Sequence, residues 1–244
     1  MSNTFIWADL STFDIRKAKR FYQACFGWTY QNIGENYLLC QVDQTPSAGL
    51  YTMPEKFQNI GMPSFWMSYI QVNDINSITQ AAEKNGAKIE LSPQAAPGGG
   101  QVALIRDPAG AGFTCYEGEG FGDDSFTDTP SQMAWNELFV SDLSKVESFY
   151  STVFNWTISP SSDKNRHDIF SSSGDKIAGL SVVSNELKGD KEYWGVYFGV
   201  ENLQLAAEKI SGLGGSIVVE EKLRGRQTIL VYDNQDAALY LIET

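Results

Sequence analysis

The chain repeats its own sequence, and this repetition constrains the fold more than any other feature. The matching positions, always the same distance apart, are Asp14 with Asp142, Tyr22 with Tyr150 and Trp28 with Trp156. A duplication of this kind predicts two tandem domains, at residues 1–118 and 133–244. Residues 119–132 between them are rich in Gly, Asp, Ser and Thr, a composition typical of a linker.

Each half divides again into a strand, a helix and three further strands. Alternating apolar residues predict a strand at Thr4–Ser11. Asp14 is placed to cap a helix that runs to about Cys25 and ends at Gly27, because apolar residues follow it at intervals of three and four. The three strands that follow are predicted near Trp28–Ile33, Tyr37–Val42 and Gly49–Met53.

The second quarter of the chain shows the same order of elements. We predict a strand at Phe65–Val72, a helix from a cap at Asp74 to Gly86, and strands near Lys88–Leu91, Gln101–Arg106 and Gly112–Glu117. The third and fourth quarters repeat it from Ala134 and Tyr193. The predicted fold class is therefore α+β, with four βαβββ modules. A ferredoxin-like duplication fits less well, because three strands follow each helix here.

The charge balance excludes several classes of partner. The chain has 18 Lys and Arg against 30 Asp and Glu, a formal net charge of −12. Such a surface repels phosphate backbones and anionic lipid headgroups, so we expect neither a nucleic acid nor a membrane as partner. The first residues carry no signal-peptide pattern, and the chain has no long apolar run, so we expect a cytoplasmic protein.

The single histidine limits the metal chemistry that the chain can support. The commonest zinc and non-haem iron sites use two or three imidazoles, which this chain cannot supply. Carboxylate sites for magnesium or manganese are not excluded by this argument. The three cysteines, Cys25, Cys40 and Cys115, form no CxxC pair, and we interpret them as small buried apolar residues.

Several segments resemble the vicinal oxygen chelate superfamily of glyoxalase I, bleomycin-resistance proteins and extradiol dioxygenases. The segments that carry the resemblance are FYQACFGW after Asp14, FYSTVFNW after Asp142, IRDPAGAGFTCYE around Asp107 and VYDNQDAALYLIE around Asp233. The resemblance implies that paired modules curl their sheets into a bowl, whose open face binds a small ligand. Because four modules lie on one chain, pairing within the chain can replace a dimer, and we expect a monomer.

The resemblance also implies a metal in each bowl, held by His, Gln or Glu side chains. The corresponding positions are Trp7, Met67 and Thr114 in the first half, and Trp135, Gly195 and Tyr240 in the second. None of these side chains is a competent ligand for a divalent metal. We therefore predict no metal at the family position and no other cofactor.

Aromatic side chains and one carboxylate replace the ligands in each half. Trp7 and Asp9 lie on one face of the first strand because side chains alternate along a strand, and Trp135 and Glu137 repeat this arrangement. The predicted ligand-binding residues are Trp7, Met67, Tyr69, Thr114 and Tyr116 in one bowl, and Trp135, Tyr197 and Tyr240 in the other. Such a lining suits an apolar or cationic molecule.

Three functions stay open at this point. The first is a metal-free module that binds a small organic molecule, as bleomycin-resistance relatives do. The second is a glyoxalase-like lyase or isomerase, or a hydroxylase-like enzyme, with Asp9 or Glu137 as the catalytic acid or base after burial raises its pKa. The third is a structural or partner-binding protein whose aromatic side chains fill both bowls.

Three other segments have a simple structural interpretation. We expect His167 to be exposed and idle, although its ordinary pKa suits a general base. Pro97–Gly100 reads as a flexible turn, since no Lys-Ser or Lys-Thr follows to form a phosphate-binding loop. Cys115 is expected to face the helices rather than the bowl.

Overall fold

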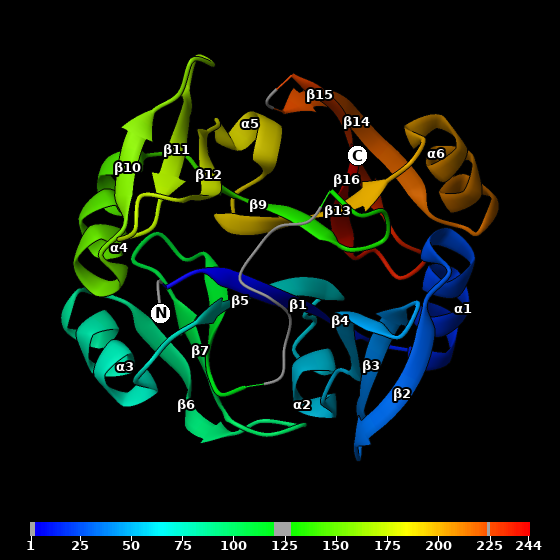
Figure 1. Ribbon diagram of the computed structural model, residues 1–244, viewed down its shortest axis with the longest axis horizontal. Helices are drawn as coiled ribbons and strands as arrows, with labels where there is room; N and C mark the ends of the chain where they lie inside the picture. Colours follow the sequence, from blue (N-terminus) through cyan, green and yellow to red (C-terminus); the bar gives the residue numbers. More distant parts are fainter. Residues whose placement is uncertain (1–2, 120–127, 224) are drawn as a thin grey trace. The chain divides into compact units, whose positions relative to one another are not determined.

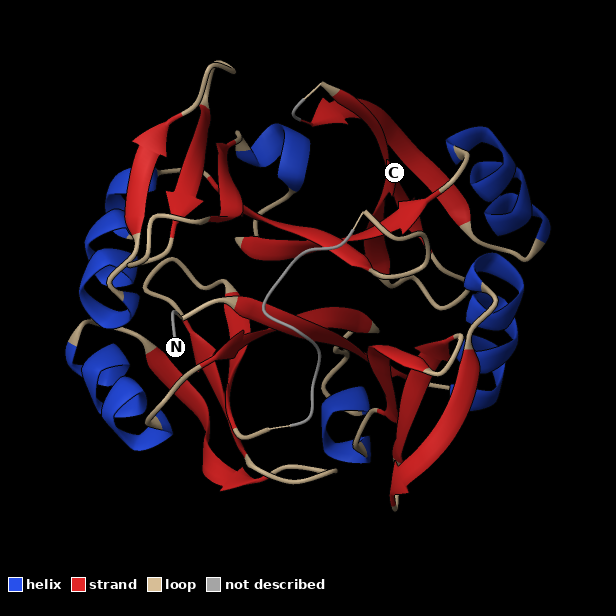
Figure 2. Ribbon diagram, viewed as in Figure 1, coloured by secondary structure: helices blue, strands red, loops and turns tan. Residues whose placement is uncertain are grey.

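The structure, a computed structural model, describes residues 3–119, 128–223 and 225–244. Most of the segment predicted as a linker, residues 120–127, lies outside this range. The first half contains β1 (Phe5–Thr12), α1 (Ile15–Phe26), β2 (Thr29–Gly34), β3 (Tyr37–Val42), β4 (Thr45–Thr52), α2 (Glu55–Gln58), β5 (Phe65–Gln71), α3 (Ile75–Lys84), β6 (Lys88–Ala95), β7 (Gln101–Arg106) and β8 (Gly112–Glu117). The α+β class and the order of the elements are confirmed (Figures 1 and 2).

The second half repeats this order. Its elements are β9 (Met133–Val140), a 3-10 turn η1 (Leu143–Lys145), α4 (Glu147–Phe154), β10 (Thr157–Pro160), β11 (Arg166–Phe170), β12 (Lys176–Val182), α5 (Asn185–Lys188), β13 (Tyr193–Val200), α6 (Leu203–Gly212), β14 (Ser216–Leu223), β15 (Arg226–Tyr232) and β16 (Ala238–Glu243). The short helices α2 and α5, which join the modules of each half, were not predicted from the sequence.

The strands form two mixed sheets of eight. The order is β2-β3-β4-β1-β5-β8-β7-β6 in the first half and β10-β11-β12-β9-β13-β16-β15-β14 in the second. Within a module the last strand pairs in parallel with the first, as β4 does with β1, and the other strands pair antiparallel. A parallel return of this kind needs a long connection, which the helix and two strands supply.

The helix ends follow the sequence signals. The Asp14 carboxylate accepts hydrogen bonds from the backbone N–H groups of Arg16 and Lys17 at 2.9 and 3.1 Å, and Gly27 ends α1 with φ 71°. Since this left-handed conformation costs glycine little, the helix stops there. The third helix differs from the prediction, because Asp142 caps the 3-10 turn and α4 begins only at Glu147.

The described residues divide into two compact units that each combine modules from both halves. The first and fourth modules make up one unit, at residues 7–67, 128–135 and 196–244 apart from residue 224. The second and third modules make up the other, at residues 3–6, 68–119 and 136–195. We call them the 1/4 unit and the 2/3 unit. In the first, α1 lies beside α6, and in the second, α3 lies beside α4 (Figure 1).

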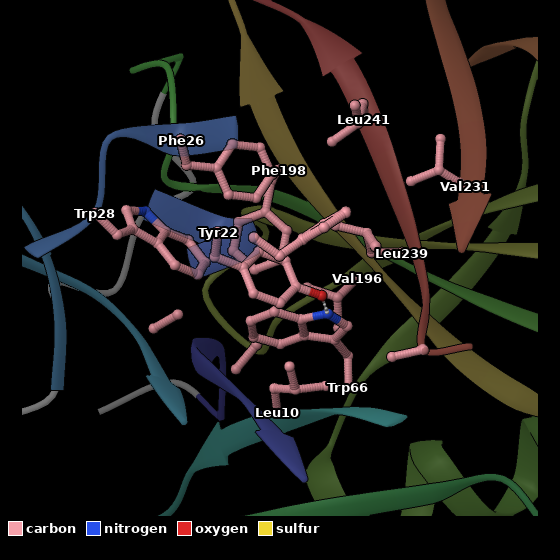
Figure 3. Close-up of a cluster of buried hydrophobic side chains, with 14 of the residues drawn as sticks. Leu10, Tyr22, Phe26, Trp28, Trp66, Val196, Phe198, Val231, Leu239 and Leu241 are labelled. Atoms are coloured by element: carbon pink, nitrogen blue, oxygen red, sulfur yellow. Dashed lines mark hydrogen bonds between the residues drawn. The ribbon is translucent and has the colours of Figure 1, made fainter. Parts of the chain in front are cut away.

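A cluster of aromatic side chains forms the core of the 1/4 unit (Figure 3). Tyr22 of α1 donates a hydrogen bond from its hydroxyl to Asp233 Oδ2 at 2.8 Å and accepts one from Trp66 Nε1 at 3.1 Å. The ring of Trp66 meets Phe198 edge to face at 4.8 Å between centroids, a geometry that stabilises aromatic pairs. The polar atoms of this core are thereby paired inside an apolar surround.

The 2/3 unit builds the same arrangement from different modules. Tyr150 of α4 donates from its hydroxyl to Asp107 Oδ2 at 2.8 Å and accepts from Trp194 Nε1 at 2.9 Å. The other oxygen of Asp107 accepts from the backbone N–H groups of residues 109, 110 and 111. The Tyr22–Asp233 and Tyr150–Asp107 pairs are therefore equivalent, and each joins two modules. The Asp107 carboxylate also stabilises the turn before β8.

Among the helices of the described residues, none is both long and apolar enough to cross a membrane.

Candidate functional site

In the first half, the face of β1 that the sequence singles out carries a buried chain of hydrogen bonds. Trp7 Nε1 donates to the hydroxyl of Tyr37 at 3.0 Å, and that hydroxyl donates to Asp9 Oδ2 at 3.3 Å. Trp7 is 2% exposed and Asp9 is 1% exposed. The structure therefore links Trp7 and Asp9 through Tyr37, which was not among the predicted site residues.

Tyr37 reaches Asp9 because Gly49 leaves space for it. Gly49 lies opposite Asp9 in the register of β4 and β1, and a Cβ atom at this position would overlap the Tyr37 hydroxyl. The ring of Tyr37 stacks on Tyr51 at 6.2 Å between centroids and 9° between planes. Burial raises the pKa of Tyr37 well above its ordinary value, so its hydroxyl stays protonated and serves as a donor at neutral pH.

Two side chains of this face are less buried than the others. Tyr51 and Met67, both in the 1/4 unit, are half-buried. Burial also raises the pKa of Tyr51 above its ordinary value, with a further contribution from the charge of Asp9. Met67 lies on β5, next to β1, and strand alternation puts it on the face opposite Trp66, which packs in the core with Ala8 and Leu10. We define the Asp9 cluster as the residues Trp7, Asp9, Tyr37, Tyr51 and Met67 of this face, of which Tyr51 and Met67 are the accessible ones.

The remaining residues predicted for the first bowl belong to the 2/3 unit and are buried. Tyr69 pairs with Thr114 in the register of β5 and β8. The Tyr116 hydroxyl donates to the backbone carbonyls of Gly99 and Glu119 at 3.3 and 3.1 Å. The glycines of Pro97–Gly100 form the predicted turn with positive φ, and a Cβ atom on Gly100 would approach the Tyr116 ring to 2.9 Å.

Glu137 occupies the position in β9 that Asp9 occupies in β1. Its carboxylate interacts with one charged and one neutral side chain of the 2/3 unit. Ser181 Oγ donates to Glu137 Oε1 at 2.6 Å, and Arg166 Nε lies 4.0 Å from the same oxygen. Arg166 Nε also donates to Ser181 Oγ at 3.2 Å. A Cβ atom on Gly179, which lies opposite Glu137, would overlap the carboxylate, so glycine is required here as at Gly49. Arg166 lies on β11, a middle strand of its module, where neither the repeat nor the family resemblance marks a partner of Glu137.

Two of the aromatic residues predicted for the second bowl pack against each other. Tyr197 and Tyr240 face each other across β13 and β16, and their rings stack at 4.4 Å with 16° between planes. Both are buried, as is Trp135. Each ring therefore covers one face of the other, and a ligand ring cannot stack there.

His167 is half-buried, so the prediction of an exposed histidine is wrong. It lies opposite Leu180, whereas its neighbours Arg166 and Asp168 lie opposite Ser181 and Gly179. Strand alternation therefore places His167 on the other face of β11 from Arg166. Its Nδ1 atom is buried and has no hydrogen-bond partner within the described part of the chain. The role of a general base beside Glu137 does not fit this position.

The side chains do not fit the metal site of the family. Trp7, Met67 and Thr114 in the first half, and Trp135, Gly195 and Tyr240 in the second, offer no imidazole or carboxylate. Across residues 3–119, 128–223 and 225–244, no three His, Cys, Asp or Glu side chains gather where they would hold a metal. Cys115 is fully buried, and its burial raises the pKa of the thiol, which disfavours a nucleophilic role.

The chain is similar to known proteins in its sequence and in its fold. The chain is 26% identical over 222 residues to the protein named "Putative glyoxylase CFP32" of Mycobacterium tuberculosis, covering 88% of this chain and 84% of that protein. It is 24% identical over 265 residues to the anthracycline biosynthesis protein DauV of a Streptomyces species, covering 97% and 92%. The fold resembles a Mn(II)-bound glyoxalase from Novosphingobium aromaticivorans with TM-score 0.68 and 12% identity, covering 100% and 83%.

The comparison with family models covers most of the chain. The model of the Glyoxalase/Bleomycin resistance protein/Dioxygenase superfamily matches twice, at residues 4–114 and 132–238. Each match covers one βαβββ module and all of the next except part of its last strand. The chain therefore belongs to the glyoxalase, bleomycin resistance protein and dioxygenase superfamily.

Proposed function

We propose that this protein binds a small organic molecule, without the metal of its family, on the Asp9 cluster of the 1/4 unit. The observation that carries the proposal is a carboxylate enclosed by aromatic side chains on the strand where the family places a metal ligand. Aromatic faces and a negative charge attract the same kind of ligand, an organic cation with an apolar body. Tyr51 and Met67 supply the accessible contacts, and the hydrogen bonds from Trp7 to Tyr37 and from Tyr37 to Asp9 hold the carboxylate in place.

The first half is the better candidate of the two. Tyr197 and Tyr240 already stack on each other, and the charge of Glu137 is compensated by Arg166. In the first half, Met67 can change its rotamer around a ligand, since an unbranched thioether adapts readily. Tyr69, Thr114 and Tyr116 are buried in the 2/3 unit, so they are not part of the site proposed here.

A pair of matched probes tests this proposal. N-methylquinolinium and neutral quinoline have nearly the same shape, and binding of each is measured by tryptophan fluorescence and by calorimetry. We expect the cation to bind more tightly, and Asp9→Asn to weaken its binding at least tenfold, about 1.4 kcal/mol, with little effect on quinoline. Glu137→Gln is the control and leaves binding unchanged. Equal binding of the cation by wild type and Asp9→Asn contradicts the proposal.

An enzyme is the second candidate, favoured by the arrangement around Glu137. A serine hydroxyl 2.6 Å from a carboxylate, with a guanidinium beside it, is a polar set that acid–base chemistry of a lyase, isomerase or hydroxylase-like enzyme would use. The structural interpretation competes with it, because Ser181 and Arg166 also satisfy a buried charge. Filled bowls and a purely structural role form the third candidate, supported by the burial of Trp7.

We expect the purified protein to contain no stoichiometric Zn, Fe, Mn, Ni or Mg at the family position. The reason is the set of side chains at that position, which includes tryptophan, methionine and threonine but no ligand of the family type. Elemental analysis after purification without chelators measures this directly. One equivalent of metal that is retained on gel filtration and lost in Asp9→Asn or Glu137→Gln contradicts the prediction.

We also expect a monomer of 27.0 kDa that binds neither nucleic acid nor anionic vesicles. Each half has two modules, so the chain supplies its own module pairs, and a net charge of −12 opposes association with copies and polyanions. Multi-angle light scattering at micromolar concentration measures the mass. A stable mass of twice this value contradicts the prediction.

A further inference from the structure

β14 is an edge strand with an exposed aliphatic stretch. It is the last strand in the order of the second sheet, and all of its residues except Leu223 are exposed. Three consecutive aliphatic side chains, Ile217, Val218 and Val219, are 43%, 47% and 39% exposed. An edge strand offers backbone N–H and C=O groups to any other strand, so an exposed aliphatic edge is a docking surface.

The other sheet edges of the described residues are more strongly protected than β14. β10 has four residues and ends at Pro160. β6 contains Pro93 and two register shifts, and β2 is short, polar and ends at Gly34. β14 has eight residues and contains neither proline nor internal glycine, although it has one register shift and ends with the charged residues Glu220, Glu221 and Lys222 before Leu223. Proline cannot donate a hydrogen bond to a neighbouring strand and a short strand offers few, so the long, proline-free β14 is the edge best suited to accept a strand.

A groove of about 750 Å³ lies beside β14, within the 1/4 unit. Helix α6 forms one wall and the face of β14 to β16 forms the other. Its apolar lining includes Leu203, Ile217 and Ile229, and its acidic lining is Glu208, Glu220 and Glu243. All three glutamates are exposed, and the groove has the volume of a typical ligand site.

The edge and the groove select the same kind of partner. A strand added to β14 would direct every second side chain toward the α6 side of the sheet, beside Ile217 and Glu220. Basic side chains there would meet three glutamates, and aliphatic ones would cover Val218 and Val219. A second copy of the chain fits poorly, because each copy carries a net charge of −12.

We propose that the β14 edge and its acidic groove bind an extended segment of a partner protein in which lysine or arginine alternates with aliphatic residues. The segment adds to the sheet as a further strand and places its cations between Glu208 and Glu220. This surface involves no residue of the Asp9 cluster, so the two proposals stand or fall separately.

The probe is an acetylated and amidated octapeptide that repeats Lys-Val four times. We expect it to slow hydrogen exchange of backbone amides between Ser216 and Glu220, and to bind with micromolar affinity in fluorescence anisotropy. An analogue N-methylated at every backbone amide has no N–H group to donate along the strand, so we expect at least tenfold weaker binding. Peptide pairing along a sheet edge is then distinguished from charge attraction alone.

Two charge variants complete the test. We expect Glu208→Lys/Glu220→Lys to weaken peptide binding at least tenfold, whereas Glu83→Lys/Glu90→Lys, with the same charge change on α3 and β6, leaves it within twofold. Thermal unfolding confirms that both variants fold. The proposal is overturned if the N-methylated analogue binds equally, if both variants lose equal affinity, or if exchange slows only elsewhere. The proposal is also overturned if the free protein is a dimer and its backbone amides at residues 216–220 already exchange slowly, because the edge then pairs with a second copy of the chain.

Discussion

Replacing Trp7 by alanine is expected to lower the free energy of unfolding by about 3 to 5 kcal/mol, the cost of truncating a buried aromatic side chain. The reason is that Trp7 is 2% exposed and that its indole donates to the Tyr37 hydroxyl. Urea unfolding followed by far-UV circular dichroism measures the change. Trp7→Phe is the matched control, since it keeps most of the apolar volume and removes the donor.

The size of this loss shows whether Trp7 belongs to the core or contacts a ligand directly. A cost of only about 1 kcal/mol for Trp7→Ala would contradict the prediction and show that solvent or ligand reaches the indole. A cost in the expected range assigns Trp7 to the core. Ligand contact then falls on Tyr51 and Met67, the half-buried members of the Asp9 cluster.

Replacing Asp107 by alanine is expected to cost about 3 kcal/mol or more. The substitution leaves the Tyr150 hydroxyl and three backbone N–H groups without their acceptor inside the 2/3 unit, and each buried unsatisfied group costs about 1 to 3 kcal/mol. Tyr150→Phe removes only one of these bonds and is expected to cost less. Equal losses for the two variants in urea unfolding would contradict this assignment.

The cost of Asp107→Asn is expected to depend on pH. Burial raises the pKa of Asp107 above its ordinary value, although the bonds from Tyr150 and the backbone oppose this shift. The folded state therefore holds this proton more tightly than the unfolded chain, and the stability that Asp107 contributes decreases as the pH rises through the raised pKa. The cost of Asp107→Asn should be larger near about pH 4 than at about pH 7. A cost that increases with pH would contradict this sign.

Much of the fold was predictable because its signals are local. Asp14, Gly27 and Asp74 mark helix ends through side-chain and backbone chemistry within a few residues, and the structure shows those ends. Strands Tyr37–Val42, Gln101–Arg106 and Gly112–Glu117 have the predicted bounds. The repeat itself indicated four similar modules, which the strand order confirms.

The contacts between modules were not predictable in this way. Tyr22 and Asp233 are hydrogen-bonded although most of the chain separates them, and no spacing rule connects such positions. The Tyr37 hydroxyl reaches Asp9 only because Gly49, on the neighbouring strand β4, has no side chain in its place. Residue types and periodicity define which face a side chain occupies, whereas the partner on that face depends on how the strands assemble.

The composition of the two compact units has a consequence for synthesis on the ribosome. The first module packs with the fourth, so α1 emerges long before the residues that complete its core, Phe198, Asp233 and Leu239. The 2/3 unit, in contrast, has all of its residues available once Gly195 has left the exit tunnel. Nascent chains of increasing length should therefore gain protease resistance first in the interior modules, while the N-terminal module stays exposed to chaperones until translation is nearly complete.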